Sequence, residues 1–268
     1  MKRQLILSIL LFSLLSSARP CDSTGISPKV THTAWYSHSE HIFRRVDIYV
    51  PEGYEHTSLP ALYLIHGING YEGSWQDMGG AIDTLNAMIA AGRCRPLILV
   101  MPDCNKWPLK QRPVNHGNLW KCLTHYGKLS REHQLEHALS DLITMIDSTC
   151  CVTPYCAVAG LSDGGRMAAN VANLRSDCVR SVGLFSPVLH KNQLPTAITD
   201  SRLSTFDFRL STNYYIYVGE IDIFYASGHR FHRRMKRAGY PHRFTKIHAG
   251  HNWHMWRLCL SDFLAQQY

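Results

Sequence analysis

The chain has 268 residues, of which 45% are hydrophobic and 18% are charged, a balance typical of a globular protein. No low-complexity tract is present, so an intrinsically disordered chain is excluded, and the length suits one domain with a sizeable core. The formal net charge of +8 at pH 7 raises the question of a nucleic-acid partner.

The first residues, 1–18, have the pattern of an export signal. Two basic residues precede the apolar stretch LILSILLFSLL, which is too short to span a bilayer. We expect cleavage after Ala18, which leaves residues 19–268 as a single secreted or periplasmic domain. Lipid attachment at Cys21 is the alternative, but Pro20 stands where a lipoprotein signal has a small residue. No later segment is long and apolar enough to predict insertion in a membrane.

Periodicity and turn residues divide the rest of the chain into alternating strands and helices. Apolar alternation or short apolar runs predict strands at 44–51, 61–65, 96–102, 156–161, 181–185 and 214–219. Helical periodicity lies between them, at 80–91, 132–147, 164–174, 225–238 and 254–266. This order predicts an α/β fold with a mostly parallel sheet and helices on both faces. Residues 103–131 have no clear period, and we expect a long loop there beside the site.

The densest basic segment, HRFHRRMKR at 229–237, does not require a nucleic-acid partner. Its arginines recur at helical spacing on one face, while Phe231, Met235 and Ala238 line the other face. A solvated face over a buried stripe explains this pattern. Because no nucleic-acid motif accompanies the charge, we expect no nucleic-acid binding.

The nine cysteines are typical of an oxidising compartment, where thiols tend to pair. We therefore expect disulfide bonds, although the sequence does not determine the pairs and an odd number leaves at least one thiol unpaired. No C-x-x-C pair or Cys/His zinc spacing is present, so we expect no metal cofactor.

The segment AGLSDGG places Ser162 between Gly160 and Gly164. A G-x-S-x-G string occurs by chance in roughly one chain in ten of this length. Here, however, it follows a predicted strand and opens a predicted helix, which is the setting of a nucleophile elbow. The alternative is a turn serine that caps its helix. We interpret Ser162 as a candidate nucleophile.

A serine nucleophile needs a base and an orienting acid from elsewhere in the chain. In elbow-type hydrolases the acid follows the serine and the histidine comes last. Loops after the last predicted strands offer two acids, Glu220 and Asp222, and three histidines, His248, His251 and His254. The residues alone leave both choices open.

The mechanism also needs a second backbone amide for an oxyanion hole, besides that of the residue after the serine. The predicted strand 61–65 runs into the glycine-rich turn His66-Gly67-Ile68-Asn69-Gly70, which could direct an amide at the site. An ordinary loop is the alternative.

Five segments in this order, YLIHGING with a following Trp, VMPD, AGLSDGG, GEIDIF and AGHNWHMW, resemble the putative-esterase branch of the α/β-hydrolases. That branch includes feruloyl and acetyl-xylan esterases, S-formylglutathione hydrolase and the mycolyltransferases. The resemblance covers about residues 40–265 and implies an α/β-hydrolase fold. It implies a nucleophile, an acid and a base at Ser162, Asp222 and His251. It also implies that the backbone amides of Asp163 and Ile68 line the oxyanion hole.

Asp163 departs from the family pattern, in which an apolar residue, often methionine, follows the serine. A carboxylate directed at the site would oppose the negative charge of the transition state. The amide of Asp163 could still donate if the side chain turned outward or paired with a nearby cation such as Arg166. Otherwise the departure predicts lowered activity or a preference for neutral acyl groups.

The resemblance and the export signal together imply a secreted serine esterase that needs no cofactor. The expected substrates are acyl esters, with acetyl or feruloyl groups on plant-type polysaccharide. Tryptophans near the motifs are candidates for stacking on a sugar or a phenolic ring, with local packing as the alternative for each: Trp75, Trp107, Trp120 and Trp253.

Three other functions stay open. An acyltransferase of the mycolyltransferase type would use the same three residues, and a non-catalytic carbohydrate-binding relative would keep only the fold. A metalloenzyme could use the histidines at 248, 251 and 254, or His133 and His137. Neither histidine set has the H-E-x-x-H pattern, so metal catalysis is disfavoured.

Overall fold

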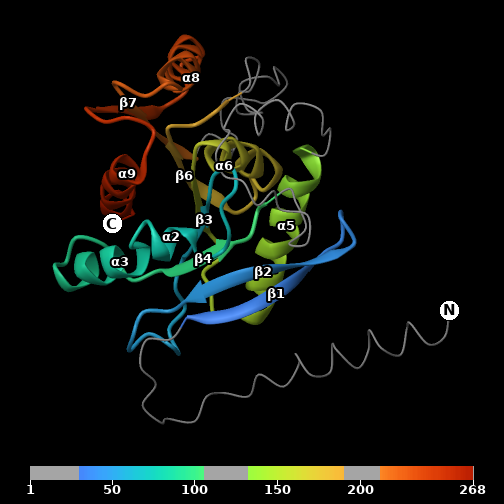
Figure 1. Cartoon of the computed structure of the whole chain (residues 1–268). Helices are drawn as coiled ribbons and strands as arrows, with labels where there is room; N and C mark the ends of the chain where they lie inside the picture. Colours follow the sequence, from blue (N-terminus) through green and yellow to red (C-terminus); the bar gives the residue numbers. More distant parts are fainter. Residues whose placement is uncertain (1–29, 106–131, 190–211, 268) are drawn as a thin grey trace.

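The computed structural model describes residues 30–105, 132–189 and 212–267. The predicted export signal, Cys21, most of the predicted loop at 103–131, Trp107 and Trp120 lie outside these residues. Within the described part, the chain folds as alternating strands and helices around one central sheet (Figure 1).

The sheet has eight strands in the order β1-β2-β4-β3-β5-β6-β7-β8. Their bounds are β1 (Thr31–Ser37), β2 (Ile42–Tyr49), β3 (Ala61–Ile65), β4 (Ile98–Pro102), β5 (Cys156–Leu161), β6 (Val179–Phe185), β7 (Asn213–Gly219) and β8 (His242–Ile247). Neighbours are parallel from β4 to β8, while β2 pairs antiparallel with both β1 and β4. The prediction of an α/β-hydrolase fold with a mostly parallel sheet is confirmed.

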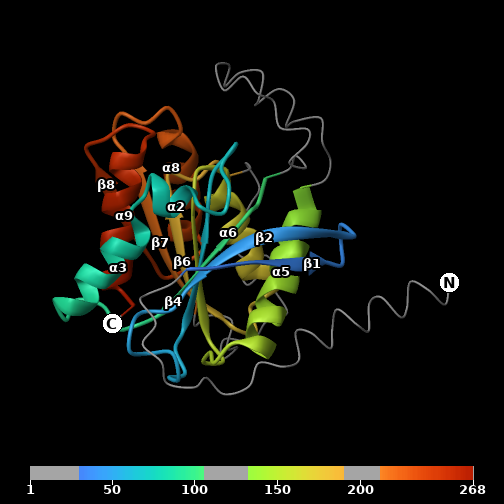
Figure 2. The ribbon, with the colours of Figure 1, turned by 60° about the horizontal axis from the view of Figure 1, so that its bottom comes forward.

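Helices cover both faces of the sheet (Figure 2). They are α2 (Ser74–Asp77), α3 (Ala81–Ala90), α5 (Glu132–Thr149), α6 (Asp163–Leu174), α8 (Tyr225–Arg237) and α9 (Trp253–Ala265). Helices α5, α6 and α8 pack on one face, and α3 and α9 lie together on the other. Strand β3 divides its side chains between these cores, with Tyr63 and Ile65 facing one and Leu62 and Leu64 the other.

Sequence patterns did not predict the two edge strands, β1 and β8. Strand β8 has the sequence HRFTKI, and each of its side chains is at least partly exposed, so it lacks the apolar run of a buried strand. Strand β1 pairs with β2 from Thr31 to Ser37, and this hairpin shifts β2 to Ile42–Tyr49 from the predicted 44–51. Edge strands often carry polar residues that discourage pairing with other chains, and this explains why β1 and β8 lack the apolar pattern that predicts a strand.

Helix α8 carries the basic segment, and its apolar stripe is buried as predicted at Phe231 and Met235. Ala238 is exposed instead, because the helix ends at Arg237. Arg230 and Arg233 face solvent. Within residues 30–105, 132–189 and 212–267, no helix combines the length and hydropathy that a membrane span requires.

The cysteines that the structure describes are free thiols, so the expected disulfide bonds are not formed among them. Cys94, Cys104, Cys156, Cys178 and Cys259 are buried, and Cys151 is exposed. Two of the buried thiols, Cys156 and Cys178, are close neighbours, with 3.9 Å between their sulfur atoms.

Candidate active site

A sharp turn between β5 and α6 holds Ser162 in the left-handed region, with φ of 55° and ψ of −119°. Glycines make this turn possible. A Cβ on Gly160 would lie 2.3 Å from the carbonyl oxygen of Gly164, and one on Gly164 would lie 2.3 Å from that of His66. The Ser162 side chain makes no capping hydrogen bond to α6, so the structure does not use it as a helix cap.

Three side chains from separate loops form one hydrogen-bonded chain. The Nε2 atom of His251 lies 3.0 Å from the Oγ atom of Ser162. On the other side of the ring, the Nδ1 atom of His251 lies 2.9 Å from the Oδ2 atom of Asp222. Since an ionised carboxylate only accepts, Nδ1 carries the proton and Nε2 is free to accept one from the serine. This is the arrangement of a Ser-His-Asp triad.

The Asp222 carboxylate lies in a buried socket at the end of β7. Its Oδ1 atom accepts a hydrogen bond from the backbone N–H of Phe224 at 2.7 Å, and its Oδ2 atom accepts one from the hydroxyl of Ser186 at 2.5 Å. Burial by itself raises the pKa of Asp222, but the hydrogen bonds from His251, Ser186 and Phe224 outweigh it. The net pKa is lowered, so the group is held as a carboxylate.

Sequence analysis did not identify Ser186. It directly follows β6 and has a φ of 47°, an uncommon conformation for a residue other than glycine. Its backbone N–H donates to the carbonyl oxygen of Tyr217 at 2.9 Å, which places its hydroxyl beside Asp222. Its position after a predicted parallel strand was the available signal, since ligands bind at that edge of the sheet.

Aromatic rings fix the orientation of the His251 imidazole. Phe224 lies edge-on to it with ring centroids 4.8 Å apart, and Trp256 does the same from α9 at 5.0 Å. Asn252 caps α9 by accepting a hydrogen bond from the N–H of Met255 at 3.1 Å. His251 is therefore attached to the start of a well-packed helix.

The remaining acid and histidine candidates pair with each other or are exposed to solvent. Glu220 pairs with His248 at 3.1 Å, in a contact where both side chains are exposed. His254 is exposed on α9. Geometry therefore brings together Ser162, Asp222 and His251, the set that the family resemblance implies.

The turn after β3 passes directly over the nucleophile elbow. A Cβ on Gly67 would lie 2.6 Å from the Leu161 side chain and 3.3 Å from the Cβ of Ser162. The backbone amides of Asp163 and Ile68 donate to no group in the described part of the chain. Asp163 directly follows Ser162, and Ile68 directly follows Gly67, whose position lies over Ser162.

Buried His66 supports this turn, a role that sequence analysis did not assign. Its Nε2 atom accepts a hydrogen bond from the N–H of Cys104 at 2.9 Å, so its Nδ1 atom is the donor to the carbonyl oxygen of Gly67 at 2.7 Å. The side chain of Asn105 donates to the carbonyl oxygen of Gly70 at 3.1 Å. These contacts tie the turn to the end of β4.

The Asp163 carboxylate turns away from the serine and enters a buried ion cluster. It accepts a hydrogen bond from the Nε atom of Arg166 at 2.7 Å. The Nη1 atom of Arg166 also donates to Glu136 of α5 at 2.9 Å, and Asn170 donates to the same Glu136 oxygen at 3.0 Å. Asp163 thus pairs with Arg166, and the arginine offsets the negative charge beside the elbow.

The aromatic candidates for substrate contact differ in exposure. Trp75 is 1% exposed and packs edge-on against Phe185 and Trp253. It presents no face to solvent, so it serves core packing, contrary to the expectation of substrate contact. Trp253 is half-buried and lies edge-on to Trp256, so part of its ring is open.

The histidine sets considered for metal binding are not arranged as ligands within the described residues. No group of three or more His, Cys, Asp or Glu side chains in that part of the chain could hold a metal ion. The side chain of His133 lies outside the described residues.

A family model described as putative esterase matches residues 39–205. That span includes the elbow and the turn after β3, but it ends before Asp222 and His251.

Solved structures resemble the chain over nine-tenths of its length. A ferulic acid esterase has a TM-score of 0.68 at 21% identity, covering 91% of this chain and 100% of that one. A ferulic acid esterase from Anaeromyces mucronatus in complex with ferulic acid has 0.69 at 17%, covering 91% and 93%. S-formylglutathione hydrolase from Staphylococcus aureus has 0.66 at 14%, covering 92% and 99%. At these identities the likeness shows a shared fold.

Proposed function

Because the chain belongs to the putative esterase family, we propose that it is a serine esterase that hydrolyses acetyl or feruloyl esters on plant-type polysaccharide after export. The observation that carries this proposal is the hydrogen-bonded chain from Ser162 through His251 to Asp222. A non-catalytic relative would not need to keep His251 at 3.0 Å from Ser162 and at 2.9 Å from Asp222.

In the proposed reaction, the Oγ atom of Ser162 attacks the ester carbonyl while His251 takes its proton at Nε2. Asp222 keeps the imidazole in the tautomer with the proton on Nδ1 and stabilises the imidazolium that forms. The alcohol then leaves with the proton from His251, and an acyl group stays on Ser162. Water repeats the cycle and releases the acid.

The negative oxygen of the tetrahedral intermediate would accept hydrogen bonds from the backbone amides of Asp163 and Ile68. Asp163 can serve here in spite of its charge, since its carboxylate pairs with Arg166 on the side away from the serine. The lowered pKa of Asp222 supports the same mechanism, because a carboxylate stabilises an imidazolium and a neutral carboxyl group does not.

The substrate class is supported by two observations. Structures with the same fold include an esterase in complex with ferulic acid and a feruloyl esterase module complexed with sinapinate. Beside His251, the half-buried rings of Phe224 and Trp253 provide apolar surface on which a phenolic acyl group could stack. The N-terminal export pattern favours an extracellular polymer as the alcohol.

The test is hydrolysis of methyl ferulate, acetylated xylan and a short p-nitrophenyl ester by the wild-type chain and by Ser162→Ala. We expect a rate loss of at least about 10³-fold in Ser162→Ala, with Ser148→Ala on the exposed end of α5 as the matched control. Turnover retained in Ser162→Ala would refute the assignment of the nucleophile.

The acyl acceptor is tested separately, by adding a sugar alcohol and analysing the products. Free acid as the main product supports a hydrolase. Acylated sugar as the main product would instead assign the chain as an acyltransferase with the same acyl-enzyme.

A further inference from the structure

Two buried cysteines lie at the end of the sheet opposite the candidate active site. Cys156 is the first residue of β5, and Cys178 directly precedes β6. The carboxyl ends of these same neighbouring strands lead to Ser162 and Ser186. A covalent link at this position would therefore join β5, which leads to Ser162, to β6, which leads to Ser186.

The backbone places the two cysteines next to each other on neighbouring strands. The N–H of Cys156 donates to the carbonyl oxygen of Cys178 at 3.1 Å, so the two residues are bonded across adjacent strands. In the strand register Cys156 pairs with Val179, so Cys178 is one residue away from the position opposite Cys156. The sulfur atoms are 3.9 Å apart. To form a bond, the sulfur atoms need to approach from this distance to about 2.05 Å.

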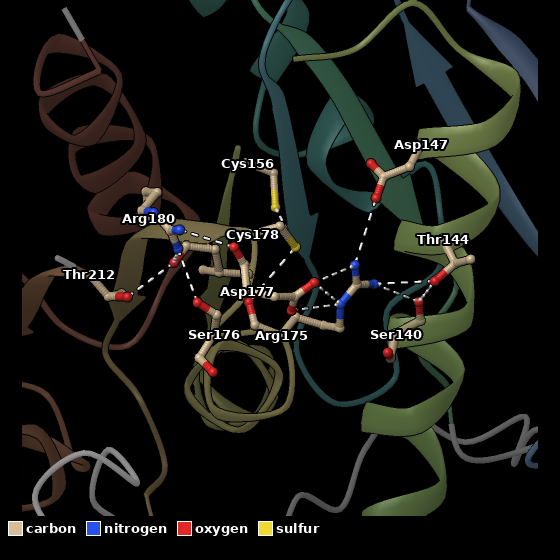
Figure 3. A network of polar contacts seen from close by, with 11 residues as sticks. Ser140, Thr144, Asp147, Cys156, Arg175, Ser176, Asp177, Cys178, Arg180 and Thr212 are labelled. Carbon is tan, nitrogen blue, oxygen red and sulfur yellow. Dashed lines mark hydrogen bonds and ion pairs between the residues drawn. The ribbon is translucent and has the colours of Figure 1, made fainter. Parts of the chain in front are cut away.

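A polar network keeps Cys178 in this position (Figure 3). Arg175 donates to Asp177 at 3.1 Å, and it also reaches α5, where it donates to the carbonyl oxygen of Ser140 and to Thr144 at 3.2 and 3.3 Å. The Nη1 atom of Arg180 donates to the carbonyl oxygen of Ser176 at 3.0 Å. The segment before β6 is thus fastened on both sides of Cys178, which limits its movement away from Cys156.

The two thiols are also chemically unequal. The S–H group of Cys156 donates toward the sulfur of Cys178, and this contact lowers the pKa of Cys178, with the nearby Arg175 adding to the effect. Cys178 is therefore the sulfur that ionises first. Thiolate is the form that attacks a disulfide.

We propose that Cys156 and Cys178 form a disulfide bond when the chain folds in the presence of a disulfide oxidant. The Cys178 thiolate attacks one sulfur of the oxidant, forms a mixed disulfide and releases one thiolate. Cys156 loses its proton to solvent and attacks the Cys178 sulfur, which releases the second thiolate. Two electrons pass from the cysteines to the oxidant, which leaves as two thiols.

Burial decides when this reaction takes place. Cys156 and Cys178 are 8% and 7% exposed in the folded chain, so an oxidant reaches them during local opening of this end of the sheet. After folding, the same burial shields the bond from reducing thiols. The bond closes a loop from 156 to 178 that contains the nucleophile elbow and all of α6.

The first experiment refolds the full chain with a mixture of oxidised and reduced glutathione, alkylates free thiols and maps the peptides. Chymotrypsin cleaves after Tyr155, and trypsin cleaves after Arg175 and Arg180. Cys156 and Cys178 then lie in different fragments with no other cysteine between those cuts. We expect a linked pair of these fragments that separates on reduction. Alkylated Cys156 and Cys178 in the refolded protein, or a link from either to another cysteine, would overturn the proposal.

The second experiment compares the thermal unfolding of the oxidised and reduced protein. Closing a loop of this length raises the midpoint by roughly 6–12 °C in a protein of this size. Cys156→Ala and Cys178→Ala should each remove this redox-dependent shift, whereas Cys259→Ala, which removes another buried thiol, should keep it. An equal shift in Cys178→Ala and Cys259→Ala would contradict the assignment. Neither readout depends on ester hydrolysis, so the proposed function can fail independently.

Discussion

Replacing Arg166 by methionine should be among the most destabilising single changes in this chain. The side chains of Arg166 and Glu136 are 2% and 1% exposed, and that of Asp163 is 11% exposed. Methionine removes the positive charge, so the carboxylates of Glu136 and Asp163 lose the cation with which both are paired. Removing one partner of a buried ion pair costs about 3–5 kcal/mol, and we expect a loss of unfolding free energy in that range.

Equilibrium unfolding in urea measures this loss. Arg243→Ala is the matched control, because Arg243 pairs with Asp262 in a contact where the side chains are 46% and 37% exposed. Exposed pairs contribute about 0–1 kcal/mol. The triple variant Asp163→Asn, Glu136→Gln, Arg166→Met carries no buried charge in the cluster and should recover most of the loss. A loss below about 1 kcal/mol in Arg166→Met, equal to that of the control, would refute this reasoning.

Activity gives a second readout of the same change. In Arg166→Met the Asp163 carboxylate lacks its cation while its amide still flanks Ser162. Under the proposed mechanism its negative charge should oppose the oxyanion and lower kcat at temperatures where the protein stays folded. Adding Asp163→Asn should restore kcat, whereas a purely structural role for the cluster predicts no such rescue.

Three further changes test other contacts of the site. Ser186→Ala removes a hydrogen bond that lowers the pKa of Asp222, so the pKa of Asp222 should rise and kcat/KM should fall by about 10-fold. An unchanged pH–rate profile would contradict the role given to Ser186. Because the folded pKa of Asp222 lies below its ordinary value of 3.8, its carboxylate stabilises the protein above that pH, and this contribution is lost as the pH falls through the folded pKa. The difference in unfolding free energy between wild type and Asp222→Asn should therefore shrink on acidification below about pH 4, and a difference independent of pH would exclude the linkage. Gly160→Ala places a Cβ 2.3 Å from a backbone oxygen and should lower the free energy of unfolding by about 3 kcal/mol or more. In the control Gly250→Ala, the Cβ meets nothing closer than 3.7 Å, and the free energy of unfolding in urea should change by less than about 1 kcal/mol. Similar losses in both variants would show that the elbow can relax.

The elements with strong local signals were predictable from sequence. Strands β3, β4, β5 and β7 are apolar runs that the sheet buries on both faces, and their pattern does not depend on distant residues. The sharp turn at Ser162 could be predicted for a similar reason, since the steric need for Gly160 and Gly164 is local to that turn.

Features that depend on distant neighbours could not be predicted in this way. Choosing Asp222 over Glu220 depends on which side chain reaches His251, and the residue pattern left that choice open. The hydroxyl of Ser186 donates a hydrogen bond to Asp222, which lies 36 positions later in the chain. Trp75 is a residue type that often binds ligands, but Phe185 and Trp253 pack against it, and no local sequence pattern predicts this burial.

The attachment of His251 to the start of α9 has a consequence for biosynthesis. Met255, Cys259, Leu260 and Phe263 hold this helix in the core shared with α3, and the helix is made after all eight strands. Under the proposed mechanism a nascent chain still emerging from the ribosome contains its serine and its acid but no seated base. Ester cleavage would then begin only once translation has passed α9 and the helix has docked, which makes turnover a reporter of completed folding.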